Sequence, residues 1–273
     1  MTTWFKEAYG ASEGRALSVL VKSLLYKKIS QFQTIEIFDT VCFGRMLVLD
    51  GVIMMTQFDN FAYHEMIVHV PMQAHPNPRK VLVIGGGDGG TINQLLKYPQ
   101  VEVTLCEIDE EVILVCKEWF PEYREAFEKV KIQIDDGSVY LRHHQNEFDV
   151  ICVDSSDPVG PAEVLFKKPF YQDIYNALTP EGIAVTQSES MYYDLDFIKN
   201  LLVQNKEIFK FVDYYYTLIP TYPSGTIGFS FCSKQYDYLE NLKSERVSCL
   251  TGLNYYSKSI HQAAFEKPRF FYF

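Results

Sequence analysis

Hydrophobic and polar positions follow two different patterns along the chain. Up to about residue 58, the segments 33–40 and 45–51 are short apolar or alternating runs that are broken by glycine. Alternation with a period of two residues, interrupted by glycine, is typical of short antiparallel strands. We therefore expect residues 1–58 to form a small N-terminal β domain.

From residue 59 onward, apolar runs alternate with longer amphipathic segments. Residues 61–75 predict a helix that ends before Pro76. Five apolar runs follow, at residues 80–87, 101–109, 130–137, 148–157 and 182–190. Helical patterns lie between them at residues 91–99, 110–120, 139–144 and 168–178, and residues 211–233 predict two further strands around a turn at 219–225. Strands that alternate with helices favour an α/β fold with a mostly parallel sheet covered on both faces.

The apolar runs of this second part end in small or acidic residues. In parallel sheets ligands bind beyond the carboxyl ends of the strands, so these endings meet on one rim. The run GGGDGG, residues 85–90, follows a strand and opens a helix, as the glycine-rich turns of nucleotide-binding folds do. Glu107 ends the next strand, where such folds place an acid for the ribose hydroxyls. Asp136 and Gly137 follow the third strand and can meet an adenine, so the three endings together predict a nucleoside site.

Asp88 separates two classes of enzyme that share this layout. A pyrophosphate at the helix N-terminus would meet a like charge at Asp88, whereas a nucleoside with an amino-bearing tail would be attracted. A plain helix cap is the alternative interpretation of Asp88, and capping does not exclude binding.

The fourth strand ends in two acids three positions apart, Asp154 and Asp157, on a loop stiffened by two prolines. A structural turn needs only one acid, so the pair indicates a site for positively charged groups. Further polar and aromatic side chains, each of which a structural role explains when taken alone, stand at Tyr63, His64, Gln187 and Tyr222.

Charge and cysteine content narrow the choice of partners. The formal net charge of −10 disfavours nucleic acid and anionic membranes as partners and favours cationic small molecules. The six cysteines form no CxxC pair and no His/Cys cluster, so we expect a reducing compartment and no metal. The first residues lack a signal-peptide pattern and no run reaches the length of a membrane span. We therefore expect a cytoplasmic protein.

Five motifs, in this order, resemble the polyamine aminopropyltransferases, the spermidine synthase family: GGGDGG, CEID, DDG, DSSDPVGPA and IPTYPSG. YHE, LDG and residues 255–270 are similar to that family as well, so the resemblance covers essentially the whole chain. It implies an N-terminal β domain at residues 1–58 and a methyltransferase-like Rossmann catalytic domain at residues 59–273. It also implies a homodimer or a homotetramer.

The resemblance assigns roles by position. Asp154 would be the catalytic proton acceptor, and residues 155–166 resemble a gatekeeping loop. The donor would be bound through its ribose by Glu107, through its adenine by Asp136 and Gly137, and through its ammonium by Asp88, with the remaining contacts from Gln33 and Pro161. The acceptor amine would be bound by Tyr63, His64, Asp88, Asp154, Asp157, Gln187 and Tyr222. No cofactor and no metal are implied, because the donor is a co-substrate.

The implied activity is transfer of an aminopropyl group from decarboxylated S-adenosylmethionine to putrescine, which gives spermidine and 5'-methylthioadenosine. Cadaverine, agmatine and spermidine stay open as acceptors. Three other readings are a putrescine N-methyltransferase that uses S-adenosylmethionine, a non-enzymatic nucleoside- or polyamine-binding protein, and a nicotinamide oxidoreductase. Asp88 argues against the first and Asp154 against the second, while the DSSDP loop has no role in the hydride transfer of the third.

Overall fold

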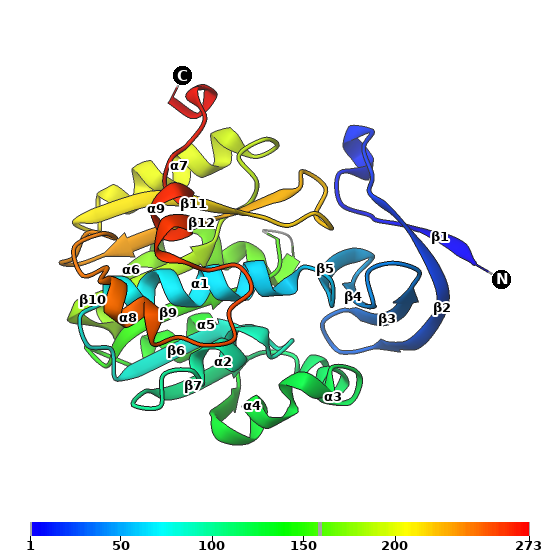
Figure 1. Cartoon of the computed structure of the whole chain (residues 1–273), viewed down its shortest axis with the longest axis horizontal. Coiled ribbons are helices and arrows are strands. Elements are labelled where there is room, and N and C mark those ends of the chain that lie inside the picture. Colours follow the sequence, from blue (N-terminus) through cyan, green and yellow to red (C-terminus); the bar gives the residue numbers. More distant parts are fainter. Residues whose placement is uncertain (1, 158–159, 273) are drawn as a thin grey trace.

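The computed structural model describes residues 2–157 and 160–272, which form two sheets (Figure 1). The first sheet is antiparallel, and its strands follow chain order: β1 (Thr3–Lys6), β2 (Ser18–Ile29), β3 (Thr34–Thr40), β4 (Arg45–Leu49) and β5 (Val52–Thr56). The expected N-terminal β structure is confirmed, but β2 is a long strand rather than a short one. Two register shifts against β3 interrupt its alternation, because each bulge adds a residue and bends the strand.

The second sheet is mostly parallel, as the alternation of strands and helices predicts. It contains β6 (Lys80–Gly85), β7 (Glu102–Glu107), β8 (Lys131–Ile134), β9 (Phe148–Asp154), β10 (Leu178–Gln187), β11 (Phe211–Leu218) and β12 (Thr226–Ser233). Their order across the sheet is β11-β12-β10-β9-β6-β7-β8, and only the pairs made by β12 are antiparallel.

Helices cover both faces of this sheet. One face packs against α1 (Asn60–Ala74), α2 (Gly90–Leu95), α3 (Glu110–Trp119), α4 (Arg124–Lys129) and α9 (Lys258–Ala264). The other face packs against α5 (Gly137–Arg142), α6 (Lys168–Ala177) and α7 (Leu195–Lys206), while α8 (Ser244–Ser248) packs against the first core through Val247. Strand β6 shows why two cores form, since Val81 and Val83 enter the first and Leu82 and Ile84 the second.

Helix α2 is shorter than the predicted helix at residues 91–99. The backbone N–H groups of Lys97 and Tyr98 bond three residues back, to Gln94 and Leu95, so the helix tightens into a turn. The residue before a proline avoids helical geometry, and Pro99 follows directly. Among the described residues, 2–157 and 160–272, no helix has the length and apolar character that crossing a bilayer requires.

The chain reverses its direction of travel across the sheet between β6 and β9, which are neighbours. Gly85 lies opposite Asp154 in the register of this pair, and the Gly86 N–H donates to the Asp154 backbone oxygen at 2.8 Å. A Cβ on Gly85 would lie 2.2 Å from that oxygen, so the close approach requires glycine. Ligands bind at such a reversal in open α/β sheets.

A buried carboxylate ties the C-terminal part of the chain to α1. Glu65 is fully buried and accepts three backbone hydrogen bonds, from the N–H groups of Asn254, Tyr255 and Tyr256 at 2.7–2.9 Å. The segment between α8 and α9 therefore passes across α1 (Figure 1). We call residues 254–256 the C-terminal strap. Because Glu65 follows Tyr63 and His64 directly, the strap holds the turn of α1 that carries both side chains.

Replacing Glu65 with alanine should destabilise the protein by at least about 3 kcal/mol, because three buried N–H groups lose their acceptor. The melting temperature should fall clearly in a thermal unfolding experiment. The matched control is Glu128→Ala, which removes an exposed glutamate from α4 and should leave the melting temperature nearly unchanged. Equal melting temperatures for the two variants would contradict the clamping role.

Candidate active site

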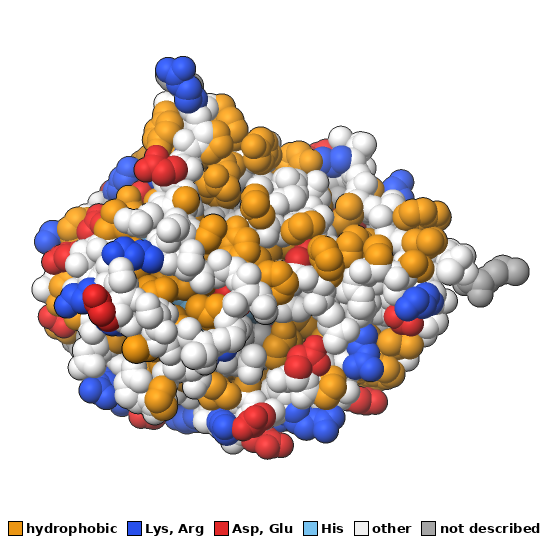
Figure 2. Space-filling model, viewed as in Figure 1, with side chains coloured by type: hydrophobic (Ala, Val, Ile, Leu, Met, Phe, Trp, Pro, Cys, Tyr) orange, Lys and Arg blue, Asp and Glu red, His pale blue; other side chains and the backbone are white. Residues whose placement is uncertain are grey.

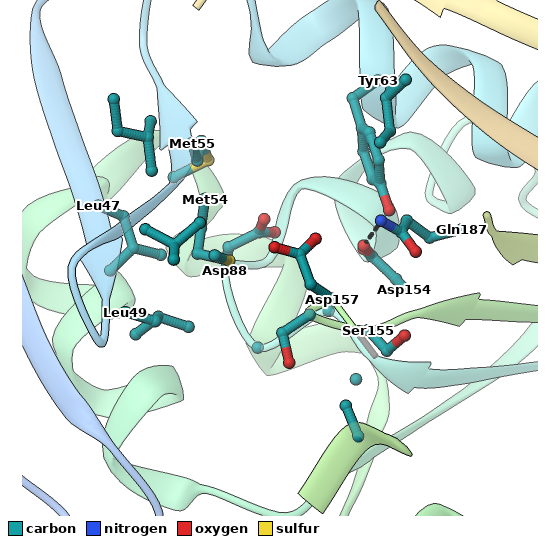
Figure 3. A pocket seen from close by; sticks show the side chains of 18 of the residues that line it. Leu47, Leu49, Met54, Met55, Tyr63, Asp88, Asp154, Ser155, Asp157 and Gln187 are labelled. Atoms are coloured by element: carbon teal, nitrogen blue, oxygen red, sulfur yellow. Dashed lines mark hydrogen bonds between the residues drawn. The ribbon is translucent and has the colours of Figure 1, made fainter. Parts of the chain in front are cut away.

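A cavity of about 370 Å³ opens at the carboxyl edge of the second sheet. The first sheet closes its other side, since Leu47 and Leu49 of β4 and Met54 and Met55 of β5 line it (Figure 3). Of the site residues predicted from sequence, the cavity is lined by Gln33, Tyr63, His64, Asp88, Glu107, Asp136, Gly137, Asp154, Asp157, Gln187 and Tyr222. The strand endings thus meet on one rim, as expected.

Two predicted features include residues or side chains that the structure does not describe. The side chain of Pro161 lies outside the described side chains, although its backbone belongs to the 3₁₀ helix η3 (Gly160–Phe166). The predicted gatekeeping loop, residues 155–166, includes residues 158–159, which also lie outside the described part. On either side of them, Ser155 and Leu165 line the cavity.

Gln33 reaches the cavity from the turn between β2 and β3 and is held there by α3. Its amide Nε2 donates to Asp109 Oδ2 at 2.9 Å, and the Ser30 hydroxyl donates to the same oxygen at 2.6 Å. Asp109 also caps α3 by accepting the Glu111 N–H at 3.2 Å. Asp109, which caps a helix packed on the second sheet, thus fixes the side chain of Gln33 in the turn between two strands of the first sheet.

Glu107 ends β7 beside the glycine-rich turn. Its two oxygens accept the N–H groups of Gly87 at 3.1 Å and of Asp109 at 2.9 Å. Burial raises the pKa of Glu107 to about 7, although these hydrogen bonds oppose the rise. Each oxygen has a further lone pair, so the carboxylate can accept two vicinal hydroxyls from the cavity.

Asp136 and Gly137 mark the start of α5 on the same rim. The Asp136 carboxylate caps the helix by accepting the Ser138 N–H at 2.8 Å. A Cβ on Gly137 would lie 2.3 Å from Ile84 Cγ2, so glycine lets the loop close against β6. Together with Glu107, these residues bound one end of the cavity, which we call the nucleoside end.

Asp88 and His64 form a pair in the middle of the cavity, in which His64 is buried and the Asp88 side chain is 15% exposed. His64 Nε2 lies 3.1 Å from Asp88 Oδ2, and the Gly90 N–H donates to Asp88 Oδ1 at 2.7 Å. Burial alone would raise the pKa of Asp88, but the charge and hydrogen bond of His64 and the Gly90 N–H lower it. Burial likewise opposes protonation of His64, but Asp88 and then Asp154 raise its pKa. A positive charge is thus favoured next to Asp88.

Asp154 ends β9 and points into the cavity beside Tyr63 (Figure 3). It accepts the Tyr63 hydroxyl at 2.8 Å through Oδ1 and the Thr91 hydroxyl at 2.5 Å through Oδ2. Burial, and then the negative charge of Asp88, raise the pKa of Asp154 to about 6. Two hydroxyl donors hold the carboxylate in one orientation, so it can accept a proton at a defined point of the cavity.

Asp157, Gln187 and Glu189 gather at the other end, which we call the far end. Burial, and then the charge of Asp194, raise the pKa of Asp157 to about 6, and burial raises the pKa of Glu189 well above its ordinary value. Gln187 Nε2 donates to Glu189 Oε1 at 3.3 Å, while the buried Gln187 Oε1 has no partner. Buried carboxyls with raised pKa values gain most from a cationic ligand.

Tyr222 lies across the cavity from Asp154. Its hydroxyl donates to the Met54 backbone oxygen at 2.8 Å, and its ring centroid lies 6.5 Å from that of Tyr63. Tyr222 therefore contributes a ring to the cavity wall and ties the turn at residues 219–225 to β5. The turn itself is anchored by Asp59, which accepts both the N–H and the hydroxyl of Thr221 at 2.8 Å.

Sequence reasoning missed several residues that shape the cavity. Thr91 directly follows the GGGDGG motif, and Glu189 stands two positions after Gln187. Closeness in sequence to these predicted site residues could therefore have identified both. Glu189 has a backbone φ of 59°, an uncommon conformation for a side chain other than glycine, and such strain gathers at functional sites. Glu7 and Tyr9 come from the N-terminal segment, and no pattern in the sequence connects them with the cavity.

The middle of the cavity can hold a cation. One ligand atom each from His64, Asp88 and Asp154 lies within 4.8 Å of the others. That spacing suits a small metal ion, and it suits an ammonium group equally well, since both carboxylates are acceptors.

Known proteins match this chain along its whole length. Residues 60–243 match the family described as Spermine/spermidine synthase domain, and residues 3–57 match the Spermidine synthase tetramerisation domain. A polyamine aminopropyltransferase of Leptospira biflexa is 51% identical over 274 residues, which cover 99% of this chain and 97% of that protein. A spermidine synthase of Schizosaccharomyces pombe is 45% identical over 275 residues, covering 98% and 92%.

Solved structures agree. A spermidine synthase in complex with the transition-state analogue AdoDATO has a TM-score of 0.94 at 37% identity and covers 98% of this chain and 93% of its own. The spermidine synthase from Thermotoga maritima has a TM-score of 0.91 at 36% identity and covers 98% and 92%.

The chain therefore belongs to the spermine/spermidine synthase family. The predicted resemblance is confirmed, and so is the methyltransferase-like Rossmann fold with its N-terminal antiparallel sheet. The protein is an enzyme of the aminopropyltransferase class, and the match to a tetramerisation domain indicates an oligomer.

At pH 8, the Asp154→Asn variant should be more stable than the parent protein. The folded chain raises the pKa of this carboxyl from 3.8 to about 6. Between these two pH values the folded state therefore binds more protons than the unfolded chain does, and the folded protein loses stability as the pH rises through this range. This rise in pKa corresponds to a loss of roughly 3 kcal/mol in the free energy of unfolding of the parent protein at pH 8.

Thermal unfolding of both proteins at pH 5 and pH 8 measures this difference. The advantage of the variant should be larger at pH 8. A variant that is less stable than the parent at pH 8 would show that Asp154 is not a buried, destabilising charge.

Proposed function

We propose that the protein is a spermidine synthase, which transfers the aminopropyl group of decarboxylated S-adenosylmethionine to putrescine and releases 5'-methylthioadenosine. The observation that carries this proposal is one shared cavity with Asp88, Asp154 and Asp157 along it, between a nucleoside end and an acidic far end. The names of the matched relatives and of the complex with AdoDATO support the same reaction.

The donor fits the nucleoside end of the cavity. Glu107 offers two acceptors for the ribose hydroxyls, Asp136 and Gly137 border the adenine, and Gln33 is fixed beside them by Asp109. The donor's ammonium takes the position beside Asp88, whose negative charge attracts it when His64 is neutral. Pro161 stays a proposed adenine contact on the strength of the resemblance alone.

The acceptor fits the remaining length of the cavity. Its distal ammonium lies at Asp157 and Glu189, beside Gln187, whose buried Oε1 supplies a further acceptor. Its reacting nitrogen lies at Asp154, between the rings of Tyr63 and Tyr222.

Asp154 has to accept a proton from the attacking amine. An amine resembles lysine, with a pKa of about 10.4, so its neutral form costs roughly 4 to 5 kcal/mol at pH 7. Asp154 has a pKa of about 6 and a fixed orientation, so it can take the proton and align the nitrogen with the carbon under attack. The sulfonium carbon–sulfur bond breaks as the nitrogen–carbon bond forms, and the nucleoside leaves as a neutral thioether.

The proposed reaction needs no cofactor, and the protein would work in the cytoplasm as an oligomer. The leaving group is neutral and the cage of His64, Asp88 and Asp154 suits an ammonium, so no metal or other cofactor is required. All six cysteines are free thiols, which suits a cytoplasmic setting. The antiparallel N-terminal sheet would join copies of the chain into a homodimer or homotetramer, in line with its family match.

Product masses from a panel of amines test the proposal directly. With decarboxylated S-adenosylmethionine, putrescine should yield spermidine and 5'-methylthioadenosine at the same rate with and without a chelator. Cadaverine, agmatine and spermidine are the competing acceptors. Asp154→Asn should lower turnover by about 100-fold or more, the usual scale for acid–base groups. Methylated putrescine formed from ordinary S-adenosylmethionine would instead identify an N-methyltransferase.

Replacing Asp88 with asparagine should weaken the preference for the decarboxylated donor over ordinary S-adenosylmethionine by about 10-fold or more. Ordinary S-adenosylmethionine carries a carboxylate, which the negative charge of Asp88 repels in this buried site. Competition binding of the two nucleosides to parent and variant measures the ratio. The control is Asp39→Asn on β3, an exposed acid that pairs with Lys22. An unchanged ratio in Asp88→Asn would remove this explanation of donor choice.

A further inference from the structure

The N-terminal segment places a guanidinium beyond the far end of the cavity. Arg15 lies between the 3₁₀ helix η1 (Ala11–Glu13) and β2, and its Cζ lies 3.7 Å from the ring centroid of Tyr193 and 5.0 Å from that of Tyr9. Both rings line the cavity. The positive charge of Arg15 is therefore one aromatic ring away from the space that the acceptor would occupy.

Tyr9 also connects Arg15 with the acids of the far end. The Tyr9 hydroxyl donates to Asp194 Oδ2 at 3.1 Å and to Glu189 Oε2 at 3.3 Å. Burial raises the pKa of Glu7 and of Asp194, and the charge of Arg15 opposes both rises. The field of Arg15 thus reaches carboxyl groups of the N-terminal segment and of the N-cap of α7.

Arg15 has an ion-pair partner, Glu13, that is more exposed to water than Arg15 itself. Glu13 Oε2 lies 2.6 Å from Arg15 Nη2, but the Glu13 side chain is 64% exposed and that of Arg15 only 21%. Water screens the exposed carboxylate more strongly than the guanidinium, which rests against two rings. The guanidinium is therefore the less screened charge of the pair where it faces Tyr9 and Tyr193.

We propose that Arg15 is a specificity-determining residue that limits the length of the acceptor amine. The inference rests on the proposed function, in which a diamine spans from Asp154 to Asp157. A triamine that is one aminopropyl arm longer would carry its third ammonium toward Tyr9 and Tyr193, where Arg15 repels it. The buried acids attract every ammonium, so a repulsive charge is needed to reject the longer amine.

The product of the reaction is itself such a triamine. Spermidine that turns round in the cavity would offer a primary amine to Asp154 and extend past Asp157. Repulsion by Arg15 disfavours that orientation and so prevents a second transfer to the product. The enzyme would then stop after one aminopropyl group.

Substitutions at Arg15 test the inference through the ratio of kcat/KM for spermidine to kcat/KM for putrescine as acceptors. Arg15→Gln should raise this ratio about 10-fold, the scale that one like charge at the edge of a cavity produces, mainly by lowering KM for spermidine. Arg15→Lys keeps the charge and should keep the ratio of the parent. High salt should narrow the difference between parent and Arg15→Gln.

The matched control is Arg124→Gln, which removes the same charge from an exposed site where the guanidinium binds the Lys117 backbone oxygen. Its ratio should equal that of the parent. An unchanged ratio in Arg15→Gln, or an equal loss with both amines, overturns the inference while the parent still makes spermidine. A parent that transfers no aminopropyl group to any diamine instead removes the proposed function itself.

Discussion

The binding properties of the cavity depend on several carboxyl groups that are withdrawn from water around it. Burial raises the pKa of Glu7 and Glu107 to about 7 and of Asp154 and Asp157 to about 6, and every one of them lines the same cavity. Such a cluster destabilises the empty fold, because a charged carboxylate loses water and gains a like-charged neighbour. Cationic substrates remove both penalties, so part of their binding energy is stored in the folded chain. The formal net charge of −10 attracts the same ligands from a distance, although charged side chains of both signs are interspersed over the face shown in Figure 2.

The two sheets share the work of building this cavity. The second sheet supplies the chemistry at the point where the chain reverses between β6 and β9, and the first supplies a wall and one side chain at each end. Glu7 reaches the far end from beyond β1, Gln33 reaches the nucleoside end from the turn after β2, and Met54 accepts the Tyr222 hydroxyl. A sheet whose family match concerns assembly thus also contributes side chains to the site.

Much of the fold and the middle of the site could be predicted from sequence, because both follow from local pattern. Buried parallel strands are continuous apolar runs, and their polar endings must share a rim, which brought Glu107, Asp136 and Asp154 together correctly. Side chains that reach the cavity from a distant segment leave no such pattern. Glu7 and Tyr9 lie in a stretch that alternates only weakly, and their contacts depend on how two sheets pack. The long strand β2 was missed for a related reason, since its two bulges break the alternation that identifies a strand.

The C-terminal strap has a consequence for the order in which the enzyme matures. Glu65 and the N–H of Tyr256 are 191 positions apart in the chain, so the strap can join α1 only after the residues between them have been synthesised. Helix α1 carries Tyr63 and His64, and chains fold from the N-terminus as they emerge. A nascent chain can therefore pack α1 into the core of the parallel sheet before the strap is present. Docking of the strap onto Glu65 is then a late step, which adds to a helix that the core already holds.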